Sequence, residues 1–387
     1  MSKRIDRISD VVGSQLCSGC GACAFLEPER YEMIDAAHFG RRPKLREGQR
    51  EQARDEAFEI CPGFSLGPWP DAEGELADLK SAWGPVLSVW EGHAGDASLR
   101  FAGSSGGAAS AVAQSALDSG FYGVLHIGAR PDNPLFNQSL LSTTPAEIAE
   151  HTGSRYAPAS PCDSLSLVEA APGPCVFIGK PCDVAAVHRI SQRRPALAEK
   201  VGLTIAFFCA GTPGTEGTLE LLRRMGIRDP QSVASFRYRG NGWPGPTTAV
   251  HRSADSELLE QTLSYEEAWG DVLVNYKHWR CNLCPDHTGA FADLAVGDPW
   301  YREVEAGNVG SSLIVPRTPR GLRHLEAAIA GGFLVAERVD PELLPRSQPN
   351  LERATAAVWG RVRMLRWLGA PAPVFRGLGS FAAWWRW

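Results

Sequence analysis

The chain has 387 residues, of which 44% are hydrophobic, and its formal net charge is -5. This length predicts two or three packed units, and the negative charge gives no electrostatic reason to expect a nucleic acid as a partner. Ten cysteines recur at ligand-like spacings in a long chain, which favours a reducing compartment over a secreted disulfide scaffold.

Neither a targeting segment nor a membrane span is predicted. The first residues, Met-Ser-Lys-Arg-Ile-Asp-Arg, are charged, and no apolar stretch follows them as it would in a signal peptide. The longest apolar run, residues 203–210, is too short to cross a bilayer. We therefore expect a cytoplasmic protein.

Three cysteines recur at intervals of two residues in Cys17-Ser-Gly-Cys20-Gly-Ala-Cys23, and a fourth, Cys61, precedes a proline. This is the spacing of a ferredoxin-type iron–sulfur ligand run, in which a glycine-rich loop turns successive thiolates inward. A four-cysteine zinc knuckle would use the same residues, but zinc sites usually present two separated cysteine pairs. The pattern favours an iron–sulfur cluster over zinc.

Strand and helix signals alternate from about residue 83 onward. Before that point we expect a short helix at 53–60 and a linker at 64–75, where Pro, Gly and Asp gather. Strands are predicted at 86–90, 122–129, 175–179 and 201–209, and helices at 104–118, 146–152, 181–191 and 214–226. Apolar strands that alternate with amphipathic helices predict an α/β unit with a parallel or mixed sheet.

The second half of the chain is predicted to mix strands and helices. Strands are expected at 233–238, 247–251, 294–296 and 313–315, and helices at 266–274, 320–329 and 351–368. We divide the chain into a ferredoxin-like 4Fe-4S cluster domain at 1–75, an α/β domain at 76–230, a C-terminal α/β part at 231–345 with a second cysteine pair, and a helical basic and aromatic tail at 346–387.

A second cysteine constellation is centred on Cys281-Asn-Leu-Cys284. Cys182 and Cys209 each follow a predicted buried strand, so both should emerge at the carboxyl edge of a parallel sheet, where α/β folds place ligands. Four thiolates can converge there, although the spacing equally permits Cys182 and Cys209 to be ordinary buried cysteines. Two further cysteines are interpreted as structural, Cys162 and Cys175.

The run Gly103-Ser104-Ser105-Gly106-Gly107 lies at a predicted junction between a strand and a helix. Glycines let a phosphate approach the backbone, the hydroxyls can donate hydrogen bonds, and a helix N-terminus offers free amides. A capped helix without a ligand explains the run equally well. The loops at 153–156 and 237–242 carry polar, aromatic and basic residues that suit either an anionic ligand or a solvated turn.

These motifs together resemble the coenzyme F420 hydrogenase/dehydrogenase beta-subunit family, which includes 7-hydroxymethyl chlorophyll a reductase and ferredoxin-dependent divinyl chlorophyllide 8-vinyl reductase. The resemblance rests on CSGCGAC, SSGG, GSRYAPAS, FIGKPCD, FFCAG, RCNLCPD and GSSLIVPRT, in this order. It implies an α/β domain that binds FAD and two 4Fe-4S clusters, held by Cys17, Cys20, Cys23 and Cys61 and by Cys182, Cys209, Cys281 and Cys284. It also implies contacts to FAD from Ser104, Ser105, Gly106, Gly107, Arg155, Tyr156 and Lys180.

Clusters pass single electrons and a flavin stores two, so the resemblance implies an oxidoreductase that couples a one-electron carrier to hydride chemistry. We expect electrons to pass from a ferredoxin-like donor through two clusters to FAD and then to a small organic acceptor. Lys180 and His93 are candidates for protonating the product. His126 lies inside an apolar strand and is interpreted as a core histidine.

Two alternatives remain open at this point. The first alternative is an electron-transfer subunit of a larger F420- or ferredoxin-linked dehydrogenase or hydrogenase complex. The second is a binding module whose fold is stabilised by zinc. A larger redox complex or a homo-oligomer is therefore an expected assembly. The terminal helix and the Trp-Trp-Arg-Trp tail match no family motif; packing on the domain is favoured over docking to a partner or peripherally to a membrane.

Overall fold

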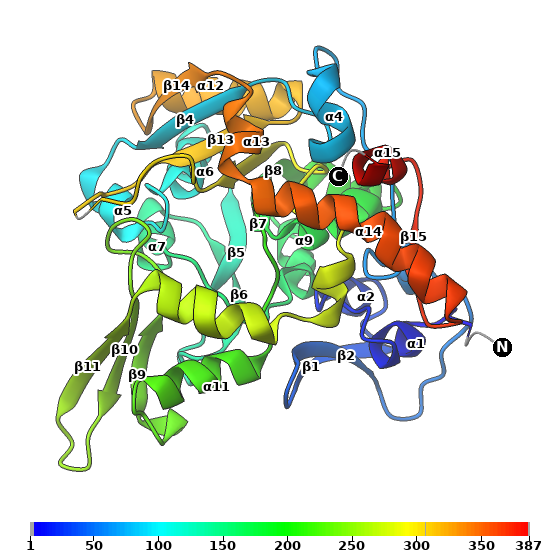
Figure 1. Cartoon of the computed structure of the whole chain (residues 1–387), viewed down its shortest axis with the longest axis horizontal. Helices are drawn as coiled ribbons and strands as arrows, with labels where there is room; N and C mark the ends of the chain where they lie inside the picture. The colour runs from blue at the N-terminus through cyan, green and yellow to red at the C-terminus, as the bar shows by residue number, and fades with distance from the viewer. Residues whose placement is uncertain (1–3, 306, 386–387) are drawn as a thin grey trace.

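An eight-stranded mixed sheet forms the centre of the computed structural model, which describes residues 4–305 and 307–385 (Figure 1). The strand order is β14-β4-β13-β12-β8-β7-β5-β6. Four consecutive strands of this sheet run parallel to one another and are β12 (Leu294–Gly297), β8 (Val201–Phe207), β7 (Cys175–Gly179) and β5 (Gly123–Ala129). The predicted α/β class with a parallel or mixed sheet is confirmed.

Antiparallel strands complete both sides of the sheet. At one edge β6 pairs with β5, and on the other side the pairing continues from β12 through β13 and β4 to β14. Their bounds are β6 (Asn137–Ser142), β13 (Ser312–Pro316), β4 (Val89–Ala94) and β14 (Leu334–Val339).

Helices cover both faces of the sheet, because the inner strands are apolar on both sides. Along β7, Val176 and Ile178 pack into the core formed with α6 (Ala108–Asp118) and α12 (Pro319–Ala330). Phe177 points to the opposite core, which includes α9. The helices of that face are α8 (Leu165–Glu169), α9 (Pro181–Ser191) and α10 (Pro195–Lys200).

A smaller antiparallel sheet, in the order β11-β10-β9, extends away from the main one (Figure 1). Phe236 and Ala249 of this sheet share a core with Leu221 of α11 and Ala268. The elements are α11 (Thr215–Arg224), β9 (Val233–Arg237), β10 (Thr247–Arg252), β11 (Leu258–Leu263) and a π-helix, η3 (Glu266–Val272), followed by the 3₁₀ turns η4 (Leu273–Tyr276) and η5 (Trp279–Leu283).

The N-terminal part has a core of its own, in which Ile8, Leu16, Tyr31 and Phe58 pack together with Leu283 of η5. The last contact joins this part to the loop that carries the second cysteine pair. The elements are α1 (Ile8–Gly13), α2 (Ala22–Leu26), the hairpin of β1 (Tyr31–Ala36) and β2 (Gly40–Leu45), and α3 (Glu56–Glu59).

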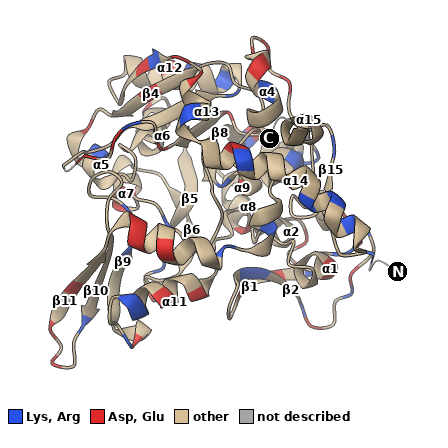
Figure 2. Cartoon of the chain, in the orientation of Figure 1, with Lys and Arg blue, Asp and Glu red and all other residues tan. Residues whose placement is uncertain are grey.

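The C-terminal segment packs on both the main body and the N-terminal part. Its elements are α13 (Leu343–Ser347), α14 (Pro349–Trp367), β15 (Val374–Phe375) and α15 (Ser380–Trp385). β15 pairs in parallel with β3 (Ser65–Leu66), and the Trp69 indole donates to the Leu378 carbonyl at 3.1 Å. Basic residues recur along α14 (Figure 2).

The aromatic tail packs on α14 in part. The ring centroids of Trp359 and Trp384 are 4.6 Å apart, as expected for a tail that packs on the domain, whereas Trp385 of the tail remains 75% exposed. Trp367, at the end of α14, is 81% exposed. Arg386 and Trp387 lie outside the described residues. Within the described part, none of the helices is both long and apolar enough to traverse a bilayer.

Several element boundaries differ from those predicted. The strand expected at 86–90 lies at Val89–Ala94, and the helix expected from 104 begins at Ala108, since Gly106 and Gly107 both adopt positive φ angles. The strands β1, β2, β3, β6, β11, β14 and β15 were not predicted, and β3 lies in the segment at 64–75 that was expected to be a linker. The other short elements are α4 (Ala77–Trp83), α5 (Ala97–Ala102), α7 (Pro145–Glu150), η1 (Pro161–Ser164) and η2 (Pro230–Ser232).

Candidate functional site

A cavity of ≈ 270 Å³ lies at the carboxyl edge of the parallel strands. Its wall includes Lys180 after β7, Cys209 after β8 and Asp298 after β12. These side chains meet because the carboxyl ends of parallel strands share one edge of a sheet. The wall also contains most of the residues that the sequence assigned to FAD, namely Ser104, Ser105, Gly107, Arg155, Tyr156 and Lys180.

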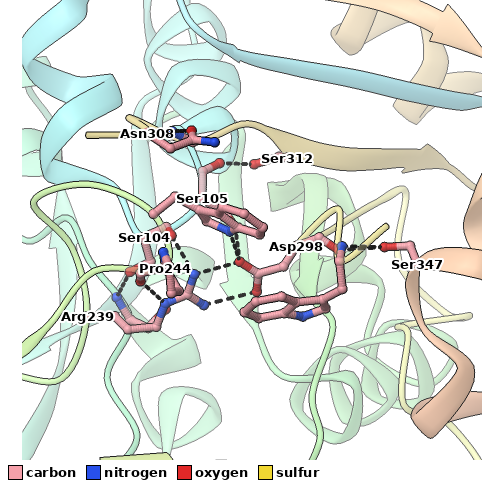
Figure 3. Close-up of polar contacts among 12 residues, drawn as sticks. Ser104, Ser105, Arg239, Pro244, Asp298, Asn308, Ser312 and Ser347 are labelled. Carbon is pink, nitrogen blue, oxygen red and sulfur yellow. Dashed lines mark hydrogen bonds and ion pairs between the residues drawn. The ribbon is translucent and has the colours of Figure 1, made fainter. Parts of the chain in front are cut away.

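A buried ion pair organises one side of this cavity (Figure 3). The Arg239 guanidinium donates to Asp298 at 3.0 Å and 2.6 Å, and its Nη2 also donates to the Ser104 carbonyl at 2.6 Å. Asp298 accepts further bonds from Ser105 and from the Trp243 indole. Burial opposes its ionisation, but Arg239 and these donors hold the pKa of Asp298 below its ordinary value.

The serine-glycine loop is thus attached to the protein at several points. Ser105 donates to Asp298, while the Ser104 hydroxyl accepts from the Ser154 amide at 2.6 Å. Gly107 directly precedes α6 and has a φ of 69°, and no side chain caps the helix. Residues at the start of α6, from Gly107 to Ser110, line the cavity, whereas Gly106 packs against the Gly310 backbone.

Aromatic side chains form another part of the wall. Tyr156, Tyr265, Trp269 and Trp300 all line the cavity. The rings of Tyr265 and Trp300 stack with centroids 5.3 Å apart, and the Arg239 guanidinium lies 5.0 Å from the Tyr265 ring centroid. Flat apolar surfaces beside a few fixed polar groups are typical of a site for a planar organic cofactor.

Lys180 lies between the cavity and the second cysteine constellation. Its ammonium group contacts the buried Asp183 carboxylate at 2.7 Å. Burial opposes the charge, but Asp183 and the thiols of Cys182 and Cys209 hold the pKa of Lys180 above its ordinary value. The Lys180 side chain therefore stays protonated and positively charged at neutral pH.

The histidines named from the sequence occupy different environments. His126 is buried, its Nε2 lies 2.8 Å from the Ser142 hydroxyl, and burial lowers its pKa to about 4, as expected for a core histidine. Its ring also borders the cavity. His93 lies on β4 with Nδ1 2.9 Å from the Ala94 carbonyl, and it is not among the lining residues.

The four cysteines of the second constellation are linked by electrostatic interactions, since Cys209 and Cys284 each act on or are acted on by the others. Burial, followed by the thiols of Cys281 and Cys284, raises the pKa of Cys209 to about 12. Burial likewise raises the pKa of Cys182, with Cys209 and Cys284 among the lesser causes. The Thr212 amide donates to the Cys281 sulfur at 3.3 Å. Cys182, Cys209, Cys281 and Cys284 therefore form one group, which we call the second cysteine set.

The first cysteine set consists of Cys17, Cys20, Cys23 and Cys61, which line one small pocket. Burial, with contributions from Cys20 and Cys17, raises the pKa of Cys61 to about 12. Cys20 is the exception, because a hydrogen bond from Cys162 lowers its pKa.

Cys162 is fully buried, and its amide donates to the Cys20 carbonyl at 2.9 Å. This contact was not predicted, since the two residues lie far apart in the chain. Cys175 begins β7 and is buried away from either set, as a structural cysteine should be.

The chemistry of both sets fits an iron–sulfur cluster. Burial and mutual repulsion oppose ionisation of most of these thiols, and an iron core supplies the positive charge that offsets this cost. Among the described residues, no group of three or more Cys, His, Asp or Glu is placed as the ligands of a bound metal ion would be. The preference for an iron–sulfur cluster over zinc therefore rests on the spacing of the cysteines.

Other residues of the site were missed or only partly anticipated from the sequence. Arg239 lies in a loop that the sequence marked as basic and aromatic, but its partner Asp298 and the stacking Trp300 were not identified. Asp298 follows a short apolar strand and could have been found from that position. Arg155 lines the cavity, although its guanidinium is engaged by the Asn137 side chain and backbone carbonyls.

The fold and the site define an α/β protein with two cysteine sets and a cavity at the carboxyl edge of its parallel strands. Residues 89–166 match the family described as coenzyme F420 hydrogenase/dehydrogenase, beta subunit N-term, and residues 174–342 match its C terminus. Together these matches cover more than half of the chain. The chain belongs to the coenzyme F420 hydrogenase/dehydrogenase beta-subunit family, which gives it a redox role.

The fold also resembles that of a solved protein. A chain of the F420-reducing [NiFe] hydrogenase complex from Methanosarcina barkeri, in a xenon-derivatised structure, superposes with a TM-score of 0.58 at 19% sequence identity. The match covers 76% of this chain and 97% of that chain. At this identity the likeness shows a shared fold. A comparison with curated proteins gave no match.

Proposed function

We propose that the protein is an oxidoreductase that holds two 4Fe-4S clusters and FAD and passes electrons from a ferredoxin-like donor to an organic acceptor. The observation that supports this most strongly is that Cys209 belongs to the second cysteine set and also lines the cavity. Groups bound at the two places would therefore be neighbours. Iron–sulfur clusters carry single electrons and a flavin exchanges one or two, which is the chemistry this arrangement would use.

In this proposal each cysteine set holds one cluster, and the cavity holds the flavin. Arg239 and Asp298 fix the serine-glycine loop, so that the free amides of α6 are ready to receive phosphate oxygens. The Ser104 hydroxyl keeps its proton for a ligand, since it accepts from Ser154. The hydroxyl proton of Ser105 is already used by Asp298.

We assign Lys180 to electrostatic stabilisation rather than to proton donation. Its pKa is held above the ordinary value, so it retains its proton and can balance negative charge in the cavity. His93 receives no role in proton transfer, because it is absent from the cavity wall. The division into domains stays a proposal, with residues 1–75 holding the first cluster.

A second candidate function is an electron-transfer subunit of a larger redox complex. The resemblance in fold to a chain of a hydrogenase complex favours it. Isolation of the protein from its native host distinguishes the two, because a subunit should copurify with a catalytic partner.

Anaerobic purification followed by determination of iron, sulfide and flavin tests the proposal. We expect about eight iron atoms and one FAD per chain, with Cys61→Ser and Cys281→Ser each losing about half of the iron. The matched control is Cys175→Ser, which should keep all the iron. Colourless wild-type protein that contains zinc would overturn the proposal.

A further inference from the structure

Arg280 is a buried arginine at the junction of the two cysteine sets. It directly precedes Cys281 of the second set, and its guanidinium donates to the carbonyls of Gly63 and Pro62, each at 2.8 Å. Those two residues follow Cys61 of the first set. A single side chain, 4% exposed, thus ties the ligand loop of one set to that of the other.

One nitrogen of this guanidinium is left without a partner. Within residues 4–305 and 307–385, Arg280 Nη1 is buried and has no hydrogen-bond acceptor. A buried charged group in this condition is costly unless a nearby anion compensates it. The Phe375 ring, whose centroid lies 5.4 Å from the guanidinium carbon, supplies only a weak cation–π contact.

The charge of Arg280 acts on both sets. Arg280 directly precedes Cys281 of the second set, and the two carbonyls that accept its hydrogen bonds belong to the residues that directly follow Cys61 of the first set. A positive charge that favours thiolates also favours the extra negative charge that a cluster gains on reduction. Burial keeps this charge from being screened by salt.

We propose that Arg280 is a positioning residue that holds the two cysteine loops together and raises the reduction potentials of both bound clusters. The inference rests on the proposed function, because it requires clusters at both sets. In this proposal Arg280 couples the two clusters in two ways. The spacing of the clusters depends on the hydrogen bonds of Arg280, and their reduction potentials depend on its charge.

Redox titration of the anaerobic holoprotein, followed by electron paramagnetic resonance, tests the proposal. Arg280→Gln should lower the equilibrium constant for reduction of each cluster about tenfold, which is 59 mV for a one-electron couple. Arg280→Lys keeps the charge but not the fork of donors, so its potentials should stay near those of the wild type. Its thermal stability should fall, because one of the two bonds to residues 62 and 63 is lost.

The matched control is Arg361→Gln. Arg361 is exposed and donates to the Asn282 carbonyl at 2.7 Å, so it contacts the same loop from the solvent side. Its charge is screened, and its removal should leave both potentials unchanged. Equal shifts in Arg280→Gln and Arg361→Gln would overturn the proposal.

The remaining outcomes are also decisive. If Arg280→Gln does not assemble its clusters, the lysine variant decides: a tenfold loss there would show that charge is not the cause. Unchanged potentials in Arg280→Gln with both clusters present would refute this inference alone. A wild-type protein without two cluster signals would instead refute the proposed function.

Discussion

Removing the carboxylate of Asp298 should destabilise the protein more than any exposed ion-pair change. Asp298→Ala leaves Arg239, which is 2% exposed, without the acceptor of its bonds at 3.0 Å and 2.6 Å, and Trp243 loses its acceptor at 2.8 Å. Breaking a buried ion pair by removing one partner costs about 3–5 kcal/mol. This is a large part of the about 5–15 kcal/mol that stabilises a typical native protein.

Urea unfolding followed by tryptophan fluorescence measures this cost, and the double variant Arg239→Met/Asp298→Leu separates its causes. Because the double variant leaves no unpaired buried charge, we expect it to recover most of the loss. The control is Glu169→Ala, which breaks the partly exposed bidentate pair with Arg194 and should cost about 1 kcal/mol or less.

The result that would refute this reasoning is a double variant less stable than Asp298→Ala by several kcal/mol. In that case the hydrogen bonds to the Ser104 loop, and not the unpaired charge, would account for the loss. A cost below about 1 kcal/mol for Asp298→Ala would contradict the burial of the pair itself.

Three further predictions concern other parts of the molecule. His126 has a pKa of about 4 in the folded state, below its ordinary value, so the free energy of unfolding should fall as the pH is lowered from about 6.5 to about 4. His126→Gln should reduce this fall by about 3 kcal/mol. A pH dependence of stability that is unaltered in the variant would contradict the argument from burial. Gly107→Ala should lower the free energy of unfolding in urea by at least about 2 kcal/mol, because Gly107 has a positive φ and a Cβ there would lie 2.7 Å from the Leu99 carbonyl oxygen. The control is Gly120→Ala, which also has a positive φ but open space around it, and it should cost about 1 kcal/mol. Trp384→Ala should destabilise the protein by about 2 kcal/mol, seen as a lower thermal midpoint, because it removes the ring contact with Trp359. The control is Trp367→Ala, which should change the midpoint little because Trp367 is 81% exposed. Equal effects of the two variants would show that the contact with Trp359 contributes nothing.

The parts of the fold that could be predicted are those in which local pattern and tertiary environment agree. β7 and α9 lie where the sequence placed them, because an apolar run followed by Lys180-Pro181 marks both the end of a buried strand and the start of a helix. β6 and β14 are edge strands with half-exposed faces, so their hydrophobic pattern is weak. Pairing with β5 and β4, rather than local propensity, gives them their structure.

The same distinction applies to the site. The cysteine spacings and the serine-glycine run are local signals, and the structure brings them to the two sets and the cavity. The Arg239–Asp298 pair joins residues 59 positions apart, and the link from Arg280 to Gly63 spans 217 positions. A single sequence does not reveal such pairings, because nothing in either segment alone specifies its partner.

The pairing of β15 with β3 has a consequence for biosynthesis. The chain between Cys61 and Trp69 is held by residues 374–378, which are synthesised long after it. Arg280, which binds the same loop, is also made long after the first three cysteines. The first cysteine set therefore reaches its final surroundings only after residue 378 has been made, so we expect a cluster bound there to be completed after that point of synthesis rather than when its cysteines first emerge.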